Sequence, residues 1–252
     1  MRRIMLTVAY DGTAYHGWQR QPDKNSIEDR LDDCLSRLLK EPVRVIGASR
    51  TDAGVHALGN IAVFDTNARM EAEKFSYALN QGLPEDIRIR ASREVPADFH
   101  PRKTDSVKTY EYHILNEEFP NPVERLYSYF CYVPLDADRM DQAARLLEGE
   151  HDFQSFCSAG AQVESTVRTI YSCTVRREGT KLTIRIRGNG FLYNMVRIIA
   201  GTLMEIGRGK YPPERMRDIL EAKDRRTAGP TAPAKGLVLV SYDFPVFSEK
   251  NG

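Results

Sequence analysis

Cysteine is scarce in this sequence of 252 residues, which holds four: Cys34, Cys131, Cys157 and Cys173. No two of them form a Cys-x-x-Cys pair, and the five histidines are just as scattered. Disulfide frameworks need paired cysteines, and zinc sites need closely spaced ligands. The sequence therefore predicts reduced thiols, no bound metal and a cytoplasmic location.

Long apolar runs are also missing, and none approaches the roughly 20 residues that cross a bilayer as a helix. The first ten residues carry two arginines and alternate between polar and apolar side chains. They lack the apolar core and the cleavage site of a signal peptide. We therefore expect a first strand here, and no membrane partner.

An excess of charge of either sign is absent, since 36 Lys and Arg face 35 Asp and Glu. A net charge of +1 neither indicates nor excludes a nucleic-acid partner, because a local basic face matters more than the sum. Charge runs are usually solvated surface, yet several of these lie on alternate positions of predicted strands. The basic clusters are Arg88, Arg90 and Arg93; Arg168, Arg176, Arg177, Lys181, Arg185 and Arg187; Arg197, Arg208 and Lys210; and Lys223, Arg225 and Arg226.

One stretch, residues 47–59, combines small residues with a polar cluster and lies between two predicted strands. Small residues allow a tight turn and the close approach of a ligand. Polar residues on a loop held by two strands are a common way to display chemistry. Asp52 is the leading catalytic candidate. The alternative is that Asp52 only caps a turn, as Asp often does between strands.

The pattern of elements predicts an α+β fold made of two ferredoxin-like, split β-α-β halves with mainly antiparallel sheets side by side and helices on one face. Ser26 is a good N-cap, with acidic residues in the first turn that follows. We place the two halves at residues 1–103 and 104–252. The predicted strands are 2–10, 43–46, 60–65, 87–89, 107–115, 126–133, 168–177, 181–187 and 236–244; the predicted helices are 26–39, 71–81, 136–147 and 212–222, with a further one ending at 206.

Two more residues stand out in the second half. Arg197 lies among apolar residues at a helix start, where an unpaired charge is costly, so it needs a carboxylate partner. One alternative is that this partner is Asp52. The other is that Arg197 forms a purely structural ion pair with any other acid. Tyr110, between Lys108 and Tyr112 on one strand face, is suited to stacking on a flat ligand such as a base. The alternative is half-buried packing in the sheet.

Four blocks resemble the tRNA pseudouridine synthase A family, occur in the family's order and span nearly the whole chain. They are Tyr10–Gln21, which contains the only Trp, Arg50–His56, Lys108–Tyr112 and Phe191–Arg197. The resemblance implies an isomerase without a cofactor. It would convert uridine to pseudouridine at positions 38, 39 and 40 of the tRNA anticodon stem-loop.

The resemblance also implies a role for individual residues. Asp52 matches the essential catalytic aspartate. Arg50 lies on the same active-site loop and is implied to bind the substrate. Tyr110 matches the tyrosine that stacks on the target base, and Arg197 matches the arginine that pairs with the aspartate. The family is homodimeric, with a basic active-site cleft between the two halves and tRNA contacted by both subunits.

Two other classes of function compete with this interpretation. A non-catalytic RNA-binding protein would keep the basic faces and the aromatic residues without needing Asp52 and Arg197 together. A hydrolase with Asp52 as nucleophile would normally need a second carboxylate. The only other acids in the four blocks are Asp11 and Glu111. Strand alternation directs Glu111 to the face opposite Tyr110.

Overall fold

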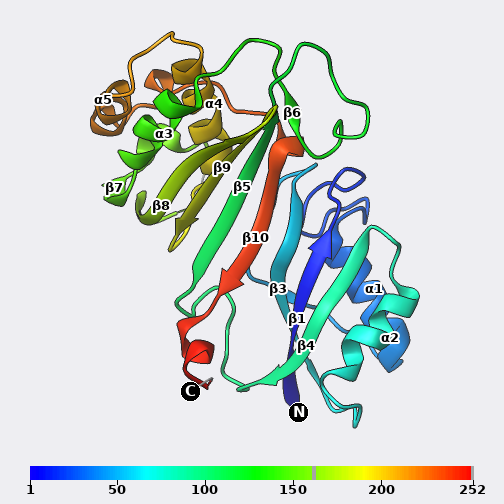
Figure 1. Cartoon of the computed structure of the whole chain (residues 1–252). Helices are drawn as coiled ribbons and strands as arrows, with labels where there is room; N and C mark the ends of the chain where they lie inside the picture. Colours follow the sequence, from blue (N-terminus) through cyan, green and yellow to red (C-terminus); the bar gives the residue numbers. More distant parts are fainter. Residues whose placement is uncertain (161–162, 251–252) are drawn as a thin grey trace. The chain divides into compact units, whose positions relative to one another are not determined.

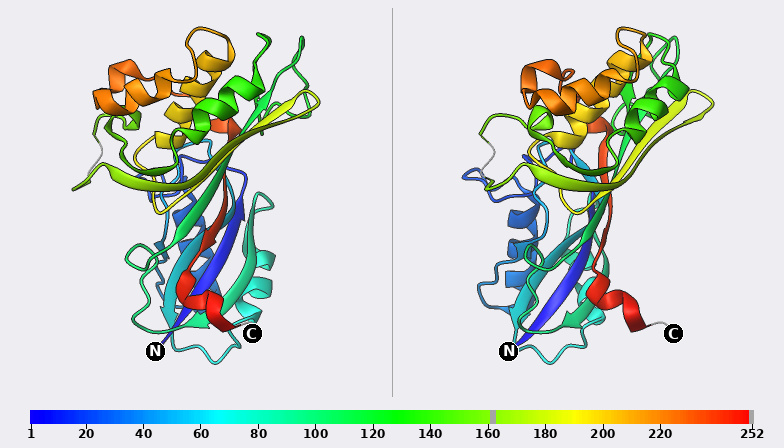
Figure 2. Two further views of the ribbon diagram at one scale, coloured as in Figure 1. Left: turned by 60° about the vertical axis from the view of Figure 1, so that its left-hand side comes forward. Right: turned by 90° about the vertical axis from the view of Figure 1, so that its left-hand side faces the viewer.

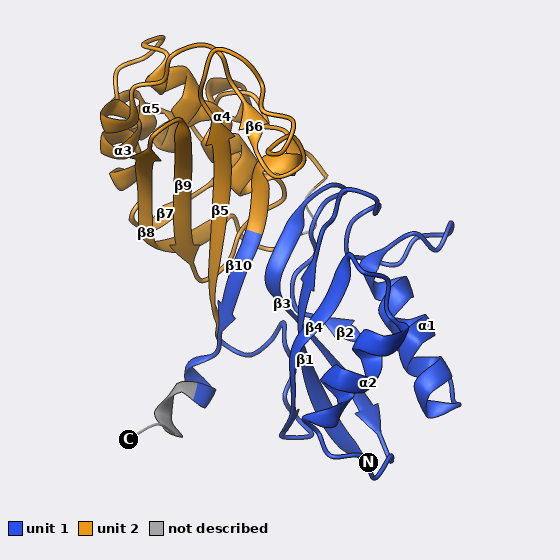
Figure 3. Cartoon of the chain, turned by 45° about the vertical axis from the view of Figure 1, so that its right-hand side comes forward, with its two compact units in different colours: residues 1–105, 239–252 blue, residues 106–238 orange. Residues whose placement is uncertain are grey.

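The computed structural model describes residues 1–160 and 163–250, which group into two compact units (Figures 1 and 3). Unit 1 comprises residues 1–105 and the C-terminal segment from Leu239, and unit 2 comprises residues 106–238. The first boundary lies two residues from the expected one. We expected the C-terminal segment to belong to the second half, but it packs on unit 1. The rings of Phe244 and Phe99 meet edge to face, with their centres 5.1 Å apart.

Unit 1 is a mixed α+β body with an antiparallel sheet. Its elements are β1 (Arg2–Tyr10), α1 (Ile27–Leu39), β2 (Ile46–Gly47), β3 (His56–Thr66), α2 (Lys74–Gly82) and β4 (Ile87–Val95). The strand order is β4-β1-β3, with β2 paired to β3, and each of these pairs is antiparallel. This is the strand order of the split β-α-β arrangement that the sequence predicts for the first half.

Helix α1 begins where the sequence predicts. The Ser26 hydroxyl accepts a hydrogen bond from the backbone N–H of Asp29 at 3.2 Å, which satisfies one of the free donors of the first turn. Leu31 and Leu35, on the apolar stripe of the helix, are fully buried. The Cys34 thiol donates to the Leu79 carbonyl oxygen at 3.6 Å and joins α1 to α2.

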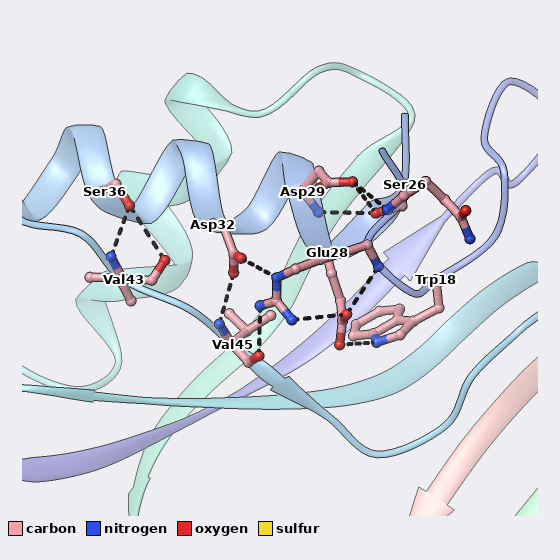
Figure 4. Close-up of polar contacts among 10 residues, drawn as sticks. Trp18, Ser26, Glu28, Asp29, Asp32, Ser36, Val43 and Val45 are labelled. Atoms are coloured by element: carbon pink, nitrogen blue, oxygen red, sulfur yellow. Dashed lines mark hydrogen bonds and ion pairs between the residues drawn. The ribbon is translucent and has the colours of Figure 1, made fainter. Parts of the chain in front are cut away.

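The strand predicted over residues 43–46 is only two residues long and begins at Ile46. Side chains of α1 take the backbone groups that a longer strand would need (Figure 4). The Val43 N–H donates to the Ser36 hydroxyl at 2.9 Å, and the Val45 N–H donates to the Asp32 carboxylate at 2.8 Å. The next strand is longer than predicted, because β3 begins at His56 rather than at residue 60.

Unit 2 combines helices with mostly antiparallel strands, and the strands of the described residues belong to one ten-stranded sheet, so the expectation of two separate sheets is wrong. Its elements are β5 (Val107–Leu115), β6 (Tyr129–Phe130), α3 (Ala137–Arg145), β7 (Gly149–Asp152), β8 (Val167–Glu178), β9 (Lys181–Gly188), α4 (Met195–Gly207) and α5 (Arg215–Ala222). Strand β10 (Leu237–Asp243) begins in unit 2 and ends in unit 1. The order within unit 2 is β5-β9-β8-β7, with antiparallel neighbours, and β6 pairs parallel to β5.

Helices α3, α4 and α5 lie on one side of the β8–β9 hairpin in both views of Figure 2. The hairpin agrees with its prediction to within a residue or two at each end. The strand predicted over residues 126–133 is reduced to β6. The side-chain amide of Asn116 bonds to the carbonyl oxygens of Cys131 and Val133, both at 2.8 Å, so these groups do not join a longer ladder. No helix of the described residues combines the length and the apolar character that a membrane span requires.

Candidate active site

Asp52 begins a tight turn on the loop between β2 and β3. The Val55 N–H donates to the Asp52 carbonyl oxygen at 3.1 Å, which closes the turn over four residues. Gly54, the third residue, has φ +76°, a value that side chains disfavour and that type II turns require at this position. Asp52 is half-buried and Arg50 is exposed. The backbone therefore turns at Asp52, and whether the carboxylate has a catalytic role stays a prediction.

Buried polar side chains hold the loop just before Asp52. The hydroxyl oxygens of Tyr10 and Thr51 are 2.8 Å apart. The side-chain amide of Asn60 donates to the Tyr10 hydroxyl at 3.3 Å and to the Ser49 carbonyl oxygen at 3.1 Å. Asn60 is fully buried and Thr51 is nearly so. Three elements, β1, the loop and β3, thus meet in one hydrogen-bonded cluster next to Asp52.

The segment after β1 clamps the same loop from a second side. The backbone N–H of Trp18 donates to the Thr51 carbonyl oxygen at 3.0 Å. The Gly12 N–H donates to Nδ1 of the buried His56 at 3.1 Å. A Cβ atom on Gly12 would lie 2.0 Å from the Val55 carbonyl oxygen, so the two backbones approach as closely as only glycine allows.

Trp18 itself is a buried anchor and not a surface residue, with 1% of its area exposed. Its indole N–H donates to the Glu28 carboxylate at 2.8 Å (Figure 4). A Cβ atom on Gly47 would lie 2.0 Å from the indole nitrogen, so the ring lies directly against the strand that leads into the loop. Trp18 therefore anchors its own segment against the strand that leads into the loop.

Arg20 balances the two acids of this anchor. Its guanidinium lies 3.1 Å from Glu28 and 2.6 Å from Asp32, and it donates to the Val45 carbonyl oxygen at 2.9 Å. Glu28 is 3% exposed, so its charge needs such partners. We expected Glu28 only as an acid that suits the start of a helix. In the structure it links the helix start to the base of the loop.

In unit 2, Arg197 lies in the first turn of α4 and is held on two sides. Its Nε donates to the Ala232 carbonyl oxygen at 2.7 Å, and its Nη1 donates to the Asn194 side-chain oxygen at 2.9 Å. The Ala232 N–H in turn donates to the Arg197 carbonyl oxygen at 3.0 Å. These bonds fix the plane of the guanidinium. A planar, charged donor group held in this way is suited to binding a further ligand.

Tyr110 lies on β5 with 7% of its area exposed. Its ring meets Phe191 edge to face, with ring centres 5.2 Å apart. Phe191 begins the block that ends at Arg197, so this contact joins the candidate residue Tyr110 to the segment that leads to Arg197. Tyr112, two residues along β5, donates to the Pro233 carbonyl oxygen at 2.9 Å, next to the carbonyl that Arg197 uses.

Glu111 fills a structural role on the other face of β5. Its carboxylate forms an ion pair with Arg185 and lies 3.0 Å from the His113 ring. The hydrogen bond from His113 is the main cause that lowers the pKa of Glu111, followed by that from Arg185. A carboxylate held ionised in this way is a poor proton donor, so Glu111 does not suit the second acid of a hydrolase.

The structure thus places Asp52 and Arg50 on one loop of unit 1, and Tyr110 and Arg197 on β5 and α4 of unit 2. Sequence reasoning missed Asn60, which was assigned to the apolar strand that follows the loop. The signal was present, because an amide at the start of a run of apolar strand residues needs partners. Among the described residues, no group of three His, Cys, Asp or Glu side chains is arranged to hold a metal ion.

Comparison with known proteins gives consistent matches. A family model described as tRNA pseudouridine synthase matches residues 6–102 and 143–245. The tRNA pseudouridine synthase A of Brevibacillus brevis is 47% identical over 239 residues, which cover 95% of this chain and 98% of that protein. The tRNA pseudouridine synthase A of Acetivibrio thermocellus is 47% identical over 244 residues, which cover 97% of this chain and 100% of that protein.

A crystal structure of the archaeal box H/ACA sRNP Nop10–Cbf5 complex is also similar to the chain, with a TM-score of 0.34 and 10% sequence identity. The similarity covers 94% of this chain and 46% of the other. A TM-score of this size supports no argument about the fold or the site.

Proposed function

The chain belongs to the tRNA pseudouridine synthase family, and on that premise we propose that it isomerises the uridines at positions 38, 39 and 40 of the tRNA anticodon stem-loop. Family membership makes the protein an isomerase that acts on tRNA. The choice of these three positions and the roles of single residues are the proposal, together with the arrangement of subunits.

We propose Asp52 as the catalytic residue, and one observation carries this assignment. Asp52 is a half-buried carboxylate at the start of a turn whose neighbours are fixed from three directions, by Tyr10, Trp18 and Asn60. Many buried contacts to one short loop restrict the loop to a narrow range of conformations. Preorganisation of this kind is what a catalytic carboxylate needs.

The chemistry suits a carboxylate. The reaction breaks the bond from C1′ of the ribose to N1 of uracil and forms a bond from C1′ to C5, after which the C5 proton is lost and N1 is protonated. Asp52 has two routes, attack on C1′ or removal of a proton from the sugar. Both place its negative charge beside a centre that becomes positive.

Three further residues complete the proposed site. Arg197 is the cation that keeps Asp52 ionised and oriented, a role that suits its fixed guanidinium plane. Tyr110 is the platform on which the detached base is retained while it turns. Arg50, exposed on the loop, binds the substrate backbone. The target uridine is part of a stem-loop, so it has to leave its stack to reach them.

Basic side chains on two strands bind the tRNA backbone in this proposal. Arg185 and Arg187 lie on one face of β9, and Arg176 lies on the same face of β8 across the hairpin. All three are exposed. Contacts from such residues to phosphates position an RNA without reading its sequence. This arrangement reconciles a nucleic-acid substrate with a net charge of only +1.

We also propose a homodimer in which both subunits contact one tRNA, located in the cytoplasm where tRNA matures. Sedimentation of the active enzyme with and without tRNA tests this arrangement. A monomer that carries out the full reaction contradicts it.

The assignment of Asp52 is tested by tritium release from tRNA labelled at C5 of uridine. Wild type should release tritium, and Asp52→Asn should release none above background while still binding tRNA. The matched control is Asp33→Asn, which makes the same change at an exposed position of α1 and should keep full activity. tRNAs that retain uridine at only one of the three positions then give the positional specificity.

Tritium release that survives in Asp52→Asn means that another residue is catalytic. Release from uridines outside the anticodon stem-loop contradicts the proposed target. Tight tRNA binding without any release by wild type favours a non-catalytic RNA-binding role.

A further inference from the structure

Asn60 uses its whole hydrogen-bonding capacity inside the protein. Its side-chain oxygen accepts from the N–H of Ile61 at 2.9 Å and from the N–H of Ser49 at 3.4 Å. Its NH₂ group donates to the Ser49 carbonyl oxygen and to the Tyr10 hydroxyl. A backbone N–H can only donate, so the two N–H partners fix which end of the amide is oxygen. The NH₂ group must therefore point at Tyr10.

This orientation favours one direction for the hydrogen bond between the Tyr10 and Thr51 hydroxyls. Either hydroxyl of this pair, whose oxygens are 2.8 Å apart, could donate, and the bond that Tyr10 already accepts from Asn60 favours Tyr10 as the donor to Thr51. Burial raises the pKa of the Tyr10 phenol above its usual range, which keeps that proton in place at physiological pH. With Tyr10 as the donor, Thr51 accepts this bond and its own hydroxyl proton points away from Tyr10.

Thr51 is also fixed through its backbone. Its carbonyl oxygen accepts from the Trp18 N–H at 3.0 Å, and that carbonyl belongs to the peptide bond that leads into Asp52. Ser49, on the other side of Arg50, is held by Asn60 at both its N–H and its carbonyl oxygen. The backbone is thus held on both sides of Arg50 and immediately before Asp52.

We propose that Asn60, Tyr10 and Thr51 form a one-way hydrogen-bond relay that positions the catalytic loop and turns the Thr51 hydroxyl into a hydrogen-bond donor beside Asp52. The three are positioning residues, and their effect on the reaction passes through Asp52 and its neighbours. The inference rests on the proposed role of Asp52. It adds two elements, β1 and β3, to the machinery of the site.

The test is a single-turnover assay of tritium release with enzyme in excess over labelled tRNA. Tyr10→Phe keeps the ring and removes the hydroxyl that links Asn60 to Thr51. Thr51→Val removes the hydroxyl that accepts the bond. Each should lower the single-turnover rate about 10- to 100-fold, because small misplacements of a reacting group have effects of this size. The Kd for tRNA should stay within about twofold of the wild-type value, because the proposed relay positions the loop and does not itself bind the tRNA.

Two controls separate positioning from a merely structural role. Thr51→Ser keeps the hydroxyl and should restore the rate to within about threefold of wild type, although it loses a methyl group. Tyr15→Phe removes another buried tyrosine hydroxyl of unit 1, one that donates to Asp86 at 2.6 Å, and should leave the rate unchanged. The Tm of every variant is measured, so that loss of fold is seen directly.

A double-mutant cycle tests the relay itself. Tyr10→Phe and Thr51→Val break the same chain of bonds, so the double variant should be no slower than the slower single variant. Multiplied effects would overturn the relay. So would a normal rate in Tyr10→Phe, or equal rates in Thr51→Ser and Thr51→Val. If Tyr10→Phe does not fold, the comparison of the two Thr51 variants decides alone.

Failure of the inference is distinguishable from failure of the proposed function. An inactive Asp52→Asn together with a fully active Tyr10→Phe removes the relay and leaves the role of Asp52 intact. An active Asp52→Asn overturns both, because a device that positions Asp52 then has no effect on the reaction.

Discussion

Asn60, Glu28 and Gly54 have no part in the proposed chemistry, yet each helps to set the position of the loop that carries Asp52. Asn60 and Glu28 are buried polar side chains whose hydrogen-bond partners lie on other elements. Leaving such a group without its partner costs about 1–3 kcal/mol. At the scale of single residues, the geometry of the loop is therefore coupled to the stability of unit 1.

Gly54 provides a prediction at this scale. Gly54→Ala places a Cβ atom at φ +76°, which should cost about 1 kcal/mol of unfolding free energy. Because the turn starts at Asp52, the rate of tritium release should fall at least tenfold as well. Urea unfolding and the single-turnover assay measure the two effects.

The control for Gly54 is Gly179→Ala in the β8–β9 turn. Gly179 also has a positive φ, +60°, and a Cβ atom there meets no other atom within 4 Å. The loss of stability should be similar, and the rate should stay that of wild type. Equal rates in the two variants would show that the turn at Asp52 is not needed for catalysis.

At the scale of elements, a cross-strand ion pair joins β1 to β3. Arg3 lies directly opposite Asp65 in the register. Its Nε and Nη2 donate to the two carboxylate oxygens of Asp65, at 2.8 and 2.7 Å. These hydrogen bonds are the main cause that lowers the pKa of Asp65. Two-pronged pairs of this kind also fix the register of the strands that carry the loop.

The lowered pKa predicts how stability depends on pH. A carboxylate with a lower pKa in the folded state adds stability above its unfolded pKa of about 3.9, and this contribution disappears as the pH falls through the folded pKa. Asp65→Asn should therefore cost about 1 kcal/mol at pH 7, a modest value because both groups are partly exposed. Below pH 4 the difference from wild type should shrink.

Urea unfolding of wild type and Asp65→Asn between pH 7 and pH 3 measures this dependence. Asp33→Asn serves again as the reference, because it makes the same change at an exposed position of α1. A constant difference between wild type and Asp65→Asn over the whole range would mean that the charge of Asp65 does not stabilise the fold.

At the scale of the whole molecule, the chain leaves unit 1 after residue 105 and returns to it at Leu239. The returning segment is held by aromatic packing. Phe244 is 5% exposed and its ring centre lies 5.1 Å from that of Phe99. The Ser49 hydroxyl, on the loop that leads to Asp52, also donates to the Tyr242 hydroxyl at 3.4 Å. Unit 1 is thus completed only by the end of the chain.

Phe244→Ala should therefore destabilise unit 1 by about 3 kcal/mol, the usual cost of removing a buried Phe side chain. Amide hydrogen exchange should speed up in β1 and β3 more than in β8 and β9, because the lost contacts belong to unit 1. Val246→Ala is the control, since Val246 is 66% exposed and its loss should change stability by less than about 0.5 kcal/mol. Equal acceleration of exchange in both units would contradict this division.

The sequence by itself determined the α+β pattern, the split β-α-β order of the first half and the position of Asp52 on a loop. These properties follow from local periodicity, caps and turn residues, as Ser26 and its helix illustrate. The resemblance of four blocks to one family supplied the activity, and the family comparisons confirm it.

Only the tertiary structure decided which polar residues hold the loop. Asn60 and Tyr10 are 50 residues apart in the chain, so no local pattern shows that their side chains bond. The length of β2 was decided in the same way, because side chains of α1 take the backbone groups that would have extended it. Hydrogen bonds between residues distant in sequence depend on the packed fold, and they determine the geometry around Asp52.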